Sequence, residues 1–426
     1  MFVGFGGNAP RVKIAMVAGQ ANYLTEYENP CSDVPSQGMH IHLAELSAAL
    51  TRAGHEVVVY TRRESKDGPD RVRSARGYEI VQVPAGPLKR LSPSETASAM
   101  GEFGGFLERE WRERGPDITH AHFWLSGVAT QLATRSLGLP TVQTFHSLGT
   151  VEHRLRGDGD PETVSTDRIR IERLVARGAT RMVATSSDEI FELARMGLPR
   201  TRTTVVPCGV DAEHFRPTDP TDPPRPKRKR LVTAGPLEPT SGFDTVIEAL
   251  AAIPDTDLVI AASRSPELSA RADEQEKSRL TKLARARGVH GRVRIRRDVS
   301  PAELPVLLRS ADAVVCTPWH DPSGTTALQA MSCGRPVIAS ATGSMLDTVL
   351  DDATGLLVPA RSPEAVAGAA RRLLSDATML TTFGIAARDR VMARYTWDRI
   401  AEDTVRVYER CVPVRRTAHR TARIGV

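Results

Sequence analysis

The sequence has few cysteines and no long apolar run. Its five cysteines are odd in number, scattered and never spaced as CxxC, which argues against a disulfide framework or a zinc site. No eighteen consecutive residues are apolar, so no segment predicts a transmembrane helix. The opening residues, MFVGFGGNAPRVKIAMVAGQ, lack the charged and apolar regions of a signal peptide. We therefore expect a cytoplasmic protein without a membrane-spanning segment.

The net charge of +6 is concentrated in two segments that read as a connector and a terminus, 225–230 (RPKRKR) and the tail after Cys411. A nucleic-acid-binding domain needs a folded basic stripe with interleaved aromatic residues, and the sequence offers none. We therefore expect no nucleic-acid partner.

Short apolar runs alternate with amphipathic helical stretches, which is typical of parallel βαβ units. Strands are predicted over 11–17, 56–60, 79–83, 118–122, 141–145, 181–185, 203–206, 231–235, 257–262, 292–296, 313–316 and 336–340. Helices are predicted over 38–53, 243–252, 277–287, 301–309, 325–333, 363–375 and 397–410. The pattern predicts an α/β protein with two doubly wound, Rossmann-like domains that face a central cleft.

A proline-rich, charged stretch interrupts this rhythm at 219–230 (DPTDPPRPKRKR) and predicts an interdomain linker. We expect an N-terminal, acceptor-side domain over 1–218 and a C-terminal, donor-binding domain over 231–394. A last helix and a basic tail occupy 395–426, and we expect the helix to pack back on the N-terminal domain.

The segment 319–340, WHDPSGTTALQAMSCGRPVIAS, runs from a strand end through a glycine-containing turn into a helix. A helix N-terminus presents free backbone N–H groups, which suit a phosphate. Gly324 permits a close approach of the backbone, and Ser323, Thr325 and Thr326 add hydroxyl groups. The spacing alone fits an ordinary loop-to-helix junction equally well.

The same segment resembles the E-x₇-E signature of retaining glycosyltransferase family 4. Matches follow in order along the chain, among them QGMHIHLAELSAALTRAGHEVVVYT, HAHFWLSG, TFHSLG, VVPCGVDAEHFRP, ADAVVCTP and DDATGLLVP. HFWLSG and TFHSLG are most similar to the subgroup that contains the mycothiol-pathway inositol-phosphate N-acetylglucosaminyltransferase and sucrose-phosphate synthase. The resemblance implies the GT-B fold and a nucleotide-diphosphate sugar as donor substrate, with no metal or other cofactor.

The resemblance implies a donor site that diverges from the family. Asp321 and Gln329 stand where the family has two glutamates, the first near the donor sugar and the second at the ribose. The turn that begins at Gly235 has Pro236 and Ser241 where the family places an arginine and a lysine against the diphosphate. We expect Arg297, with Arg294 and Arg296, to supply positive charge, although a solvated charge run is the other interpretation. Gly38 matches the second glycine of the family's diphosphate-binding turn.

On the acceptor side, the resemblance implies that His146 contacts the donor sugar near its reacting centre, so His146 and Asp321 are the predicted catalytic residues. His122, Phe123, Ser147 and Arg168 are the predicted acceptor-binding residues. Phe123 replaces a tyrosine that binds acceptor phosphate in the inositol-phosphate subgroup, so we do not carry that acceptor over. For Arg168, an ordinary helix-surface charge stays open.

Together these features predict a retaining glycosyltransferase that moves a sugar from a nucleotide sugar to a small polar acceptor, in specialised biosynthesis. The alternative is a catalytically degenerate subunit that supports a partner transferase. A homo-oligomer and a complex with a partner transferase both stay open.

Overall fold

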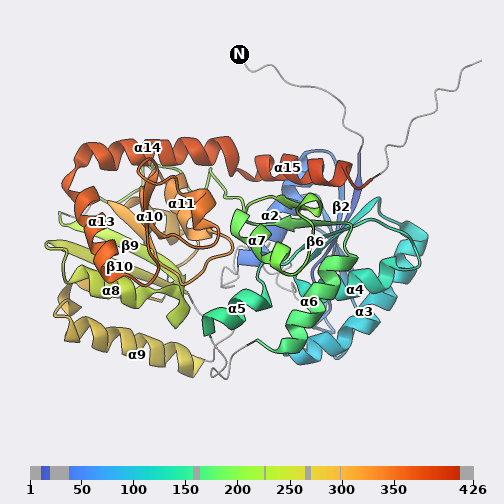
Figure 1. Cartoon of the computed structure of the whole chain (residues 1–426). Helices are drawn as coiled ribbons and strands as arrows, with labels where there is room; N and C mark the ends of the chain where they lie inside the picture. The colour runs from blue at the N-terminus through green and yellow to red at the C-terminus, as the bar shows by residue number, and fades with distance from the viewer. Residues whose placement is uncertain are drawn as a thin grey trace, which may run out of the picture.

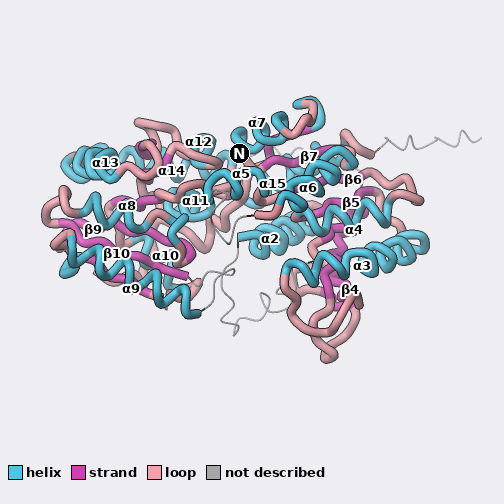
Figure 2. The backbone as a smooth tube through the Cα atoms, turned by 60° about the horizontal axis from the view of Figure 1, so that its bottom comes forward, coloured by secondary structure: helices cyan, strands magenta, loops and turns pink. Residues whose placement is uncertain are grey.

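The computed structural model describes residues 11–19, 38–156, 164–224, 227–263, 270–297 and 299–412. They form two α/β lobes side by side, and the last two helices, α14 and α15, run along one side of both lobes (Figure 1). In each lobe the strands form a central layer with helices on both faces (Figure 2). The predicted fold class, two doubly wound Rossmann-like domains, is confirmed.

The sheet of the first lobe has, within the described residues, eight strands in the order β3-β4-β2-β1-β5-β6-β7-β8. All neighbouring pairs are parallel except β3 with β4. The strands are β1 (Lys13–Val17), β2 (Glu56–Arg62), β3 (Arg71–Arg73), β4 (Glu79–Val83), β5 (Ile118–His122), β6 (Thr141–Thr144), β7 (Arg181–Ala184) and β8 (Thr203–Val205). The helices are α2 (Gly38–Arg52), α3 (Pro93–Arg114), α4 (Trp124–Thr134), α5 (Gly149–Arg156), α6 (Thr166–Gly178), α7 (Ser187–Arg195) and the 3₁₀ turn η1 (Arg200–Arg202).

The sheet of the second lobe has, in the part of the chain that the structure describes, six parallel strands in the order β11-β10-β9-β12-β13-β14. The strands are β9 (Lys229–Pro236), β10 (Thr256–Ser263), β11 (Val293–Arg296), β12 (Ala313–Cys316), β13 (Val337–Ser340) and β14 (Gly355–Val358). The helices of this lobe are α8 (Phe243–Leu250), α9 (Ala270–Ala286), α10 (Glu303–Arg309), α11 (Thr325–Ser332), α12 (Met345–Thr348), α13 (Pro363–Ser375) and α14 (Ala377–Arg394), with the 3₁₀ turns η2 (Pro239–Ser241) and η3 (His290–Arg292). The last helix, α15 (Trp397–Glu409), returns to the first lobe.

Several elements were not predicted individually from the sequence, among them β3, β14, the short helix α12 and the long helix α14. The helix α14 is the instructive case, because its buried residues are Phe383, Gly384, Ala387 and Val391. Small residues produce only a weak apolar periodicity in the sequence. A Cβ on Gly384 would lie 2.3 Å from the backbone oxygen of Gly334, so close backbone contact holds this helix in place.

The chain crosses between the lobes twice. After the first lobe, the segment predicted as a linker is anchored to the second lobe, because Asp222 accepts hydrogen bonds of 2.5 and 2.6 Å from the buried Arg309 of α10. The strand β9 begins at Lys229, inside that segment. The second crossing follows α14, and α15 packs on α2 of the first lobe.

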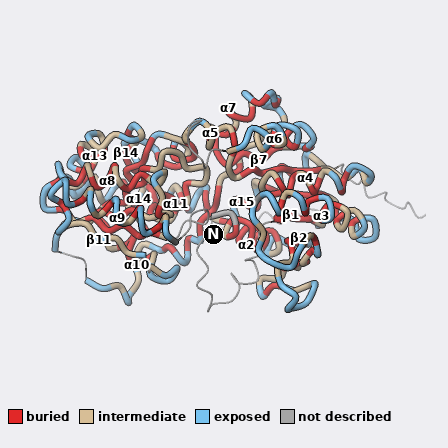
Figure 3. The backbone as a smooth tube through the Cα atoms, turned by 90° about the horizontal axis from the view of Figure 1, so that it is seen from below, coloured by how far each residue is buried: buried red, intermediate tan, exposed pale blue. Residues whose placement is uncertain are grey.

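Buried residues occupy the interior of each lobe, and the outer helices carry the exposed faces (Figure 3). One core cluster of the first lobe joins β1, β2, β5 and α2 to the far end of the chain, since it includes Trp397, Ile400 and Tyr408 of α15. The helix α15 is therefore part of the first lobe's hydrophobic core.

Candidate active site

The carboxyl ends of the two sheets meet where the lobes touch. The hydroxyl of Thr185, directly after β7, donates to the backbone oxygen of Pro322, beyond β12, at 2.8 Å. The backbone N–H of Ser187 donates to Asp347 Oδ2 at 2.6 Å. Ligands of open α/β sheets bind at the carboxyl ends of the strands. This junction is therefore the candidate site.

A cluster of histidines lies on the first lobe's side of the junction. His122, the last residue of β5, is fully buried, and its Nδ1 lies 2.9 Å from Nε2 of the half-buried His146, which follows β6. His42 of α2 contacts His146 edge to face, with ring centroids 5.1 Å apart. Burial lowers the pKa of His42 to about 4 and holds the pKa values of His122 and His146 well below their usual range. All three rings are therefore neutral at pH 7.

His120 supports this cluster from behind. Its Nδ1 lies 2.8 Å from the hydroxyl of Tyr408, and its Nε2 lies 2.9 Å from Thr144 Oγ1. Burial lowers the pKa of His120 to about 3, so this ring too is neutral. Both of its nitrogens are used within the protein. His120 therefore fixes strand and helix positions and is not a ligand contact.

The His122–His146 contact fixes which nitrogen of His146 carries the proton. Two neutral rings share one hydrogen bond, so one of the two facing nitrogens donates. Nε2 of His122 is buried without a hydrogen-bond partner in the described part of the chain. An orphaned buried N–H is rarer in proteins than an orphaned acceptor, so the favoured arrangement has His122 Nδ1–H donating to His146 Nε2. His146 then presents Nδ1–H, a hydrogen-bond donor, for a ligand.

Phe123 adopts an unusual backbone conformation directly before α4, with φ 71° and ψ 156°. This region is essentially restricted to glycine and costs about 1–3 kcal/mol for other residues. Two hydrogen bonds hold the residue there, from its N–H to Thr144 O at 2.8 Å and from Gln143 Nε2 to its carbonyl at 3.1 Å. Such strain is common at ligand sites. The ring of Phe123 lies under the guanidinium of Arg168, 5.3 Å from its centroid.

The guanidinium of Arg168 is engaged by two carboxylates of the first lobe. It donates to Glu152 at 2.9 and 3.0 Å, to the fully buried Glu172 at 2.8 Å and to the hydroxyl of Ser147 at 3.1 Å. Glu172 also accepts a hydrogen bond from the backbone N–H of Gly149. The sequence left surface charge and phosphate contact open for Arg168. The structure places it beside Ser147 and Phe123, with its charge balanced by glutamates.

On the second lobe's side, the turn after β9 carries a carboxylate. Ser241 Oγ donates to the backbone oxygen of Pro236 at 2.6 Å, and Thr240 Oγ1 donates to Glu238 at 2.7 Å. Gly242 ends the turn at φ 70°, where a Cβ would lie 1.9 Å from the backbone oxygen of Thr317. The turn is thus fixed against the end of β12. Gly235 lies near the end of β9, directly before this turn.

The expectation that backbone amides near Gly324 are free for a phosphate is wrong for two of them. Oδ1 of Asp321 accepts hydrogen bonds from the N–H of Ser323 at 2.8 Å, from Ser323 Oγ at 3.0 Å and from the N–H of Gly324 at 2.9 Å. The short aspartate side chain folds back on its own turn. Within the described structure, Asp321 Oδ2 makes no hydrogen bond in that turn, so it is available for a sugar hydroxyl.

The remaining donor-side predictions lie in three separate places. Thr325 and Thr326 begin α11, where their hydroxyls donate to Ser323 Oγ at 3.0 Å and to Ala234 O at 3.3 Å, and half-buried Gln329 lies one turn further along. Arg297 lies apart, after β11 and paired with Glu274 of α9 at 2.5 Å. Gly38 is the first residue of α2, and the residues before it lie outside the described part of the chain.

A cavity of about 280 Å³ lies between the lobes. The first lobe lines it with residues of α5 and α7 and with Ser147, the neighbour of His146. The second lobe contributes Thr240 of the turn after β9, and His320 and Pro322 before α11. Of the predicted site residues that the structure describes, Ser147 alone lines this cavity, whereas Thr240 and Pro322 are sequence neighbours of the predicted residues Ser241, Asp321 and Ser323. The lining residues Glu152, Asp188, Glu189, Glu192 and Glu238 were not predicted as site residues.

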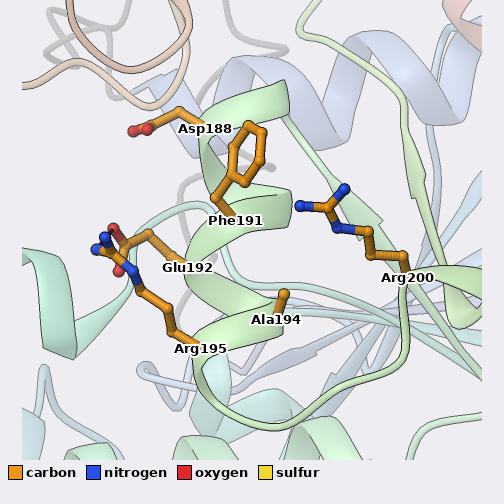
Figure 4. Close-up of a pocket in the computed structure, with 6 residues that line it drawn as sticks. All are labelled: Asp188, Phe191, Glu192, Ala194, Arg195 and Arg200. Carbon is orange, nitrogen blue, oxygen red and sulfur yellow. Dashed lines mark hydrogen bonds and ion pairs between the residues drawn. The ribbon is translucent and has the colours of Figure 1, made fainter.

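A second depression, of about 460 Å³, lies on the outer side of α7 and has a different character (Figure 4). Arg200 points towards the ring of Phe191, with its guanidinium carbon 4.9 Å from the ring centroid, while Glu192 is paired with Arg195 at 3.0 Å. All of its lining residues come from α7 and the turn that follows, and none is a predicted site residue. We therefore assign the chemistry to the cavity between the lobes.

One further feature escaped the sequence analysis. Arg361, after β14, adopts φ 57°, and its guanidinium carbon lies 4.2 Å from the ring centroid of Trp319. Trp319 in turn donates its backbone N–H to Thr240 O at 2.8 Å, in the turn that follows β9. Positive φ and stacking on an aromatic ring are tertiary features that one sequence does not reveal.

Within the described ranges, no group of three or more histidine, cysteine, aspartate or glutamate residues is arranged to hold a metal ion. In the same ranges, no helix combines the length and the apolar character needed to cross a membrane.

Comparisons with known proteins agree on one family. The model of glycosyltransferase family 4 matches residues 36–214, and the model of glycosyl transferases group 1 matches residues 216–390. A D-inositol 3-phosphate glycosyltransferase of Kineococcus radiotolerans is 33% identical over 401 residues, which cover 88% of this chain and 91% of the relative. An enzyme of the same name from Xylanimonas cellulosilytica is 33% identical over 389 residues, covering 87% of this chain and 91% of the relative. Sucrose-phosphate synthase from Thermosynechococcus elongatus superposes with a TM-score of 0.80 at 26% identity, covering 94% of this chain and 99% of that one.

Proposed function

This chain belongs to glycosyltransferase family 4, and from that premise we propose that it moves a sugar from a nucleoside-diphosphate donor to a small polar acceptor, with retention of the anomeric configuration. The observation that carries the proposal is the cavity between the lobes. Ser147, the sequence neighbour of His146, lines it from the first lobe. Thr240 of the turn after β9 and Pro322, which precedes α11, line it from the second lobe.

The sugar donor would lie against the second lobe, with its diphosphate near the turn 236–242 and the start of α11. Asp321 Oδ2 would accept a hydrogen bond from a sugar hydroxyl, while Oδ1 keeps the turn folded. Arg361 is our candidate for a cation near the leaving group, because the structure shows it without a carboxylate partner among the described residues and Trp319 holds it at the same sheet edge. We propose that Ser241, Gln329, Thr325 and Thr326 also contact the sugar donor.

In the transfer step, the bond between the anomeric carbon and the diphosphate oxygen breaks as the acceptor oxygen bonds to the same face of that carbon. The acceptor proton passes to the leaving phosphate oxygen, so no separate carboxylate base is needed. His146 would donate Nδ1–H to a sugar hydroxyl and fix the donor's orientation, since its ring is neutral. Closure of the lobes would keep out water, which otherwise hydrolyses the donor.

The test has two parts. Calorimetric titration with UDP, ADP, GDP and dTDP should show at least one dissociation constant near or below about 0.1 mM, a typical range for enzyme substrates. Mass spectrometry of mixtures of the matching nucleotide sugars with a panel of polyols and aminated sugars should then reveal a product, and NMR coupling constants should show the donor's anomeric configuration in it. A folded protein that binds none of the nucleotides would favour the degenerate partner subunit instead. A product of inverted configuration would refute retention alone.

A further inference from the structure

The cavity between the lobes is rich in carboxylates. Five acidic residues and one arginine line it: Glu152, Asp188, Glu189, Glu192, Glu238 and Arg156. Two of the acids are balanced from behind, because Glu152 is paired with Arg168 and Glu192 with Arg154 and Arg195. Asp188 faces His320 at 3.9 Å, and burial lowers the pKa of that histidine, so the ring brings little positive charge. The cavity therefore keeps an excess of negative charge.

Glu189 is the member that has no cationic partner among the described residues. It is only 8% exposed, and its Oε2 accepts hydrogen bonds from the N–H of Thr185 at 2.7 Å and from the hydroxyl of Thr185 at 2.8 Å. Its Oε1 is buried with no hydrogen-bond partner in the described part of the chain. Buried polar atoms are almost always paired, and a buried carboxylate oxygen without a donor is costly. Glu189 also lines the cavity, so a ligand there that carries N–H groups and displaces the side chain slightly would supply the donor.

The hydroxyl of Thr185 adds a second argument. It lies within hydrogen-bond distance of two acceptors, Glu189 Oε2 and Pro322 O, both at 2.8 Å, yet it carries one proton. The conflict disappears if Glu189 is protonated and donates to Thr185, which then donates to Pro322. Burial also raises the pKa of Glu189, which favours the same state. Glu189 is therefore a carboxyl group, which would release its proton to solvent and become a carboxylate when a cation binds.

Carboxylates also engage Arg168, the residue that was predicted to bind an acceptor phosphate. Arg168 is the only predicted phosphate contact on this side, and Glu152 and Glu172 already balance its charge. Phe123 offers no hydroxyl. A phosphorylated acceptor would therefore meet the carboxylate of Asp188, and it would compete with Glu152 and Glu172 for the charge of Arg168.

We propose that the acceptor of this transferase carries a protonated amine, which binds in the cavity between Glu189 and the neighbouring carboxylates Asp188 and Glu152. This assignment rests on the proposed sugar transfer and names the acceptor class for it. The volume of 280 Å³ is near the lower end of ligand pockets, about 300–1,000 Å³, and suits a single substituted ring. The amine of the acceptor supplies the hydrogen bonds that Glu189 Oε1 lacks.

The test uses pairs of ligands that differ by one amine. Binding of scyllo-inosamine against scyllo-inositol, and of glucosamine against glucose, is measured by calorimetry on the full chain with saturating nucleotide. The amine of each pair should bind at least about 10-fold more tightly, as expected for a hydrogen bond to a charged group. Glu189→Gln keeps a carbonyl oxygen for the N–H of Thr185 but removes the charge, and it should abolish this preference. Glu113→Gln, an exposed glutamate on α3, is the matched control and should leave the preference unchanged.

A second variant keeps the proposal open to refutation if Glu189→Gln does not fold. Glu152→Gln should release part of the charge of Arg168, so binding of myo-inositol 1-phosphate should rise by about 10-fold while binding of the amines falls. Equal binding of amines and alcohols, or tight binding of the phosphate by the wild type, would overturn the amine assignment. The nucleotide titration distinguishes the two proposals: nucleotide binding without any amine binding refutes only the acceptor class, and loss of nucleotide binding refutes the transfer itself.

Discussion

Replacing Pro236 with arginine and Ser241 with lysine should strengthen the binding of nucleoside diphosphates. The family resemblance places these two cations against the diphosphate, and here the turn offers a proline, a serine hydroxyl already used by Pro236 O and the carboxylate of Glu238. Each new charge-assisted hydrogen bond contributes roughly 1.5–3 kcal/mol, or about 3–6 kcal/mol for the pair. Both positions are half-buried, so solvent and Glu238 will weaken the gain.

We therefore expect about half of the full value, which is about 10-fold to 100-fold in affinity for the best nucleotide. Isothermal calorimetry measures it directly, and circular dichroism checks the fold. The double variant Thr381→Arg/Thr382→Lys adds the same charges to exposed positions of α14 and controls for long-range attraction. A change of less than about twofold, well below one charged hydrogen bond, in a folded protein would show that the diphosphate does not lie against the turn 236–242, and the donor site would need to be placed elsewhere.

Three further predictions follow from the site. Asp321→Asn keeps an oxygen for the N–H groups of Ser323 and Gly324, so it should retain nucleotide affinity but lower the transfer rate by about 10²-fold. Asp321→Ala removes that oxygen and should reduce both the affinity and the rate. Equal kinetics of the two variants would exclude a role for Oδ2. ¹⁵N NMR of histidine-labelled protein, with His146→Gln for assignment, should find the proton of His146 on Nδ1, and a proton on Nε2 would contradict the proposed relay from His122. Acidification should destabilise the protein between pH 6.5 and about 4. In the folded state the pKa values of His40 and His42 are lowered to about 4 and that of His120 to about 3. The unfolded chain therefore binds more protons than the folded protein in this pH window. The loss is about 2 kcal/mol per histidine at pH 5, and urea midpoints that stay constant from pH 7 to pH 5 would refute the burial of these rings.

The fold could be predicted from the sequence because strand and helix periodicities are local. Each predicted strand is present, and the ends of β5 and β6 place His122 and His146 at one sheet edge. The resemblance to family 4 and to its inositol-phosphate and sucrose-phosphate subgroup is confirmed by the family models, the relatives and the superposed structure. The helix α14 was missed because glycine and alanine carry its packing.

The partners of the site residues could not be predicted, because they depend on the tertiary structure. Asp321 was predicted to lie near the donor sugar, and the sequence did not reveal that its Oδ1 also holds its own turn. Arg168 meets Glu152 from a different helix, and Arg297 meets Glu274 of α9. The orphaned oxygen of Glu189 becomes visible only when β7, α7 and the second lobe are assembled around it. Charge identity was readable in the sequence, whereas charge pairing was not.

The position of α15 has a consequence for how the protein is made. Tyr408 bonds to His120 across 288 residues, and Trp397 stacks edge-on against His42, so both supports of the histidine cluster are translated near the end of synthesis. The second lobe can complete its own core during synthesis while the core of the first lobe still lacks the helix α15. A chain that ends before α15 should therefore present a finished donor half beside an acceptor half whose histidines have lost their scaffold.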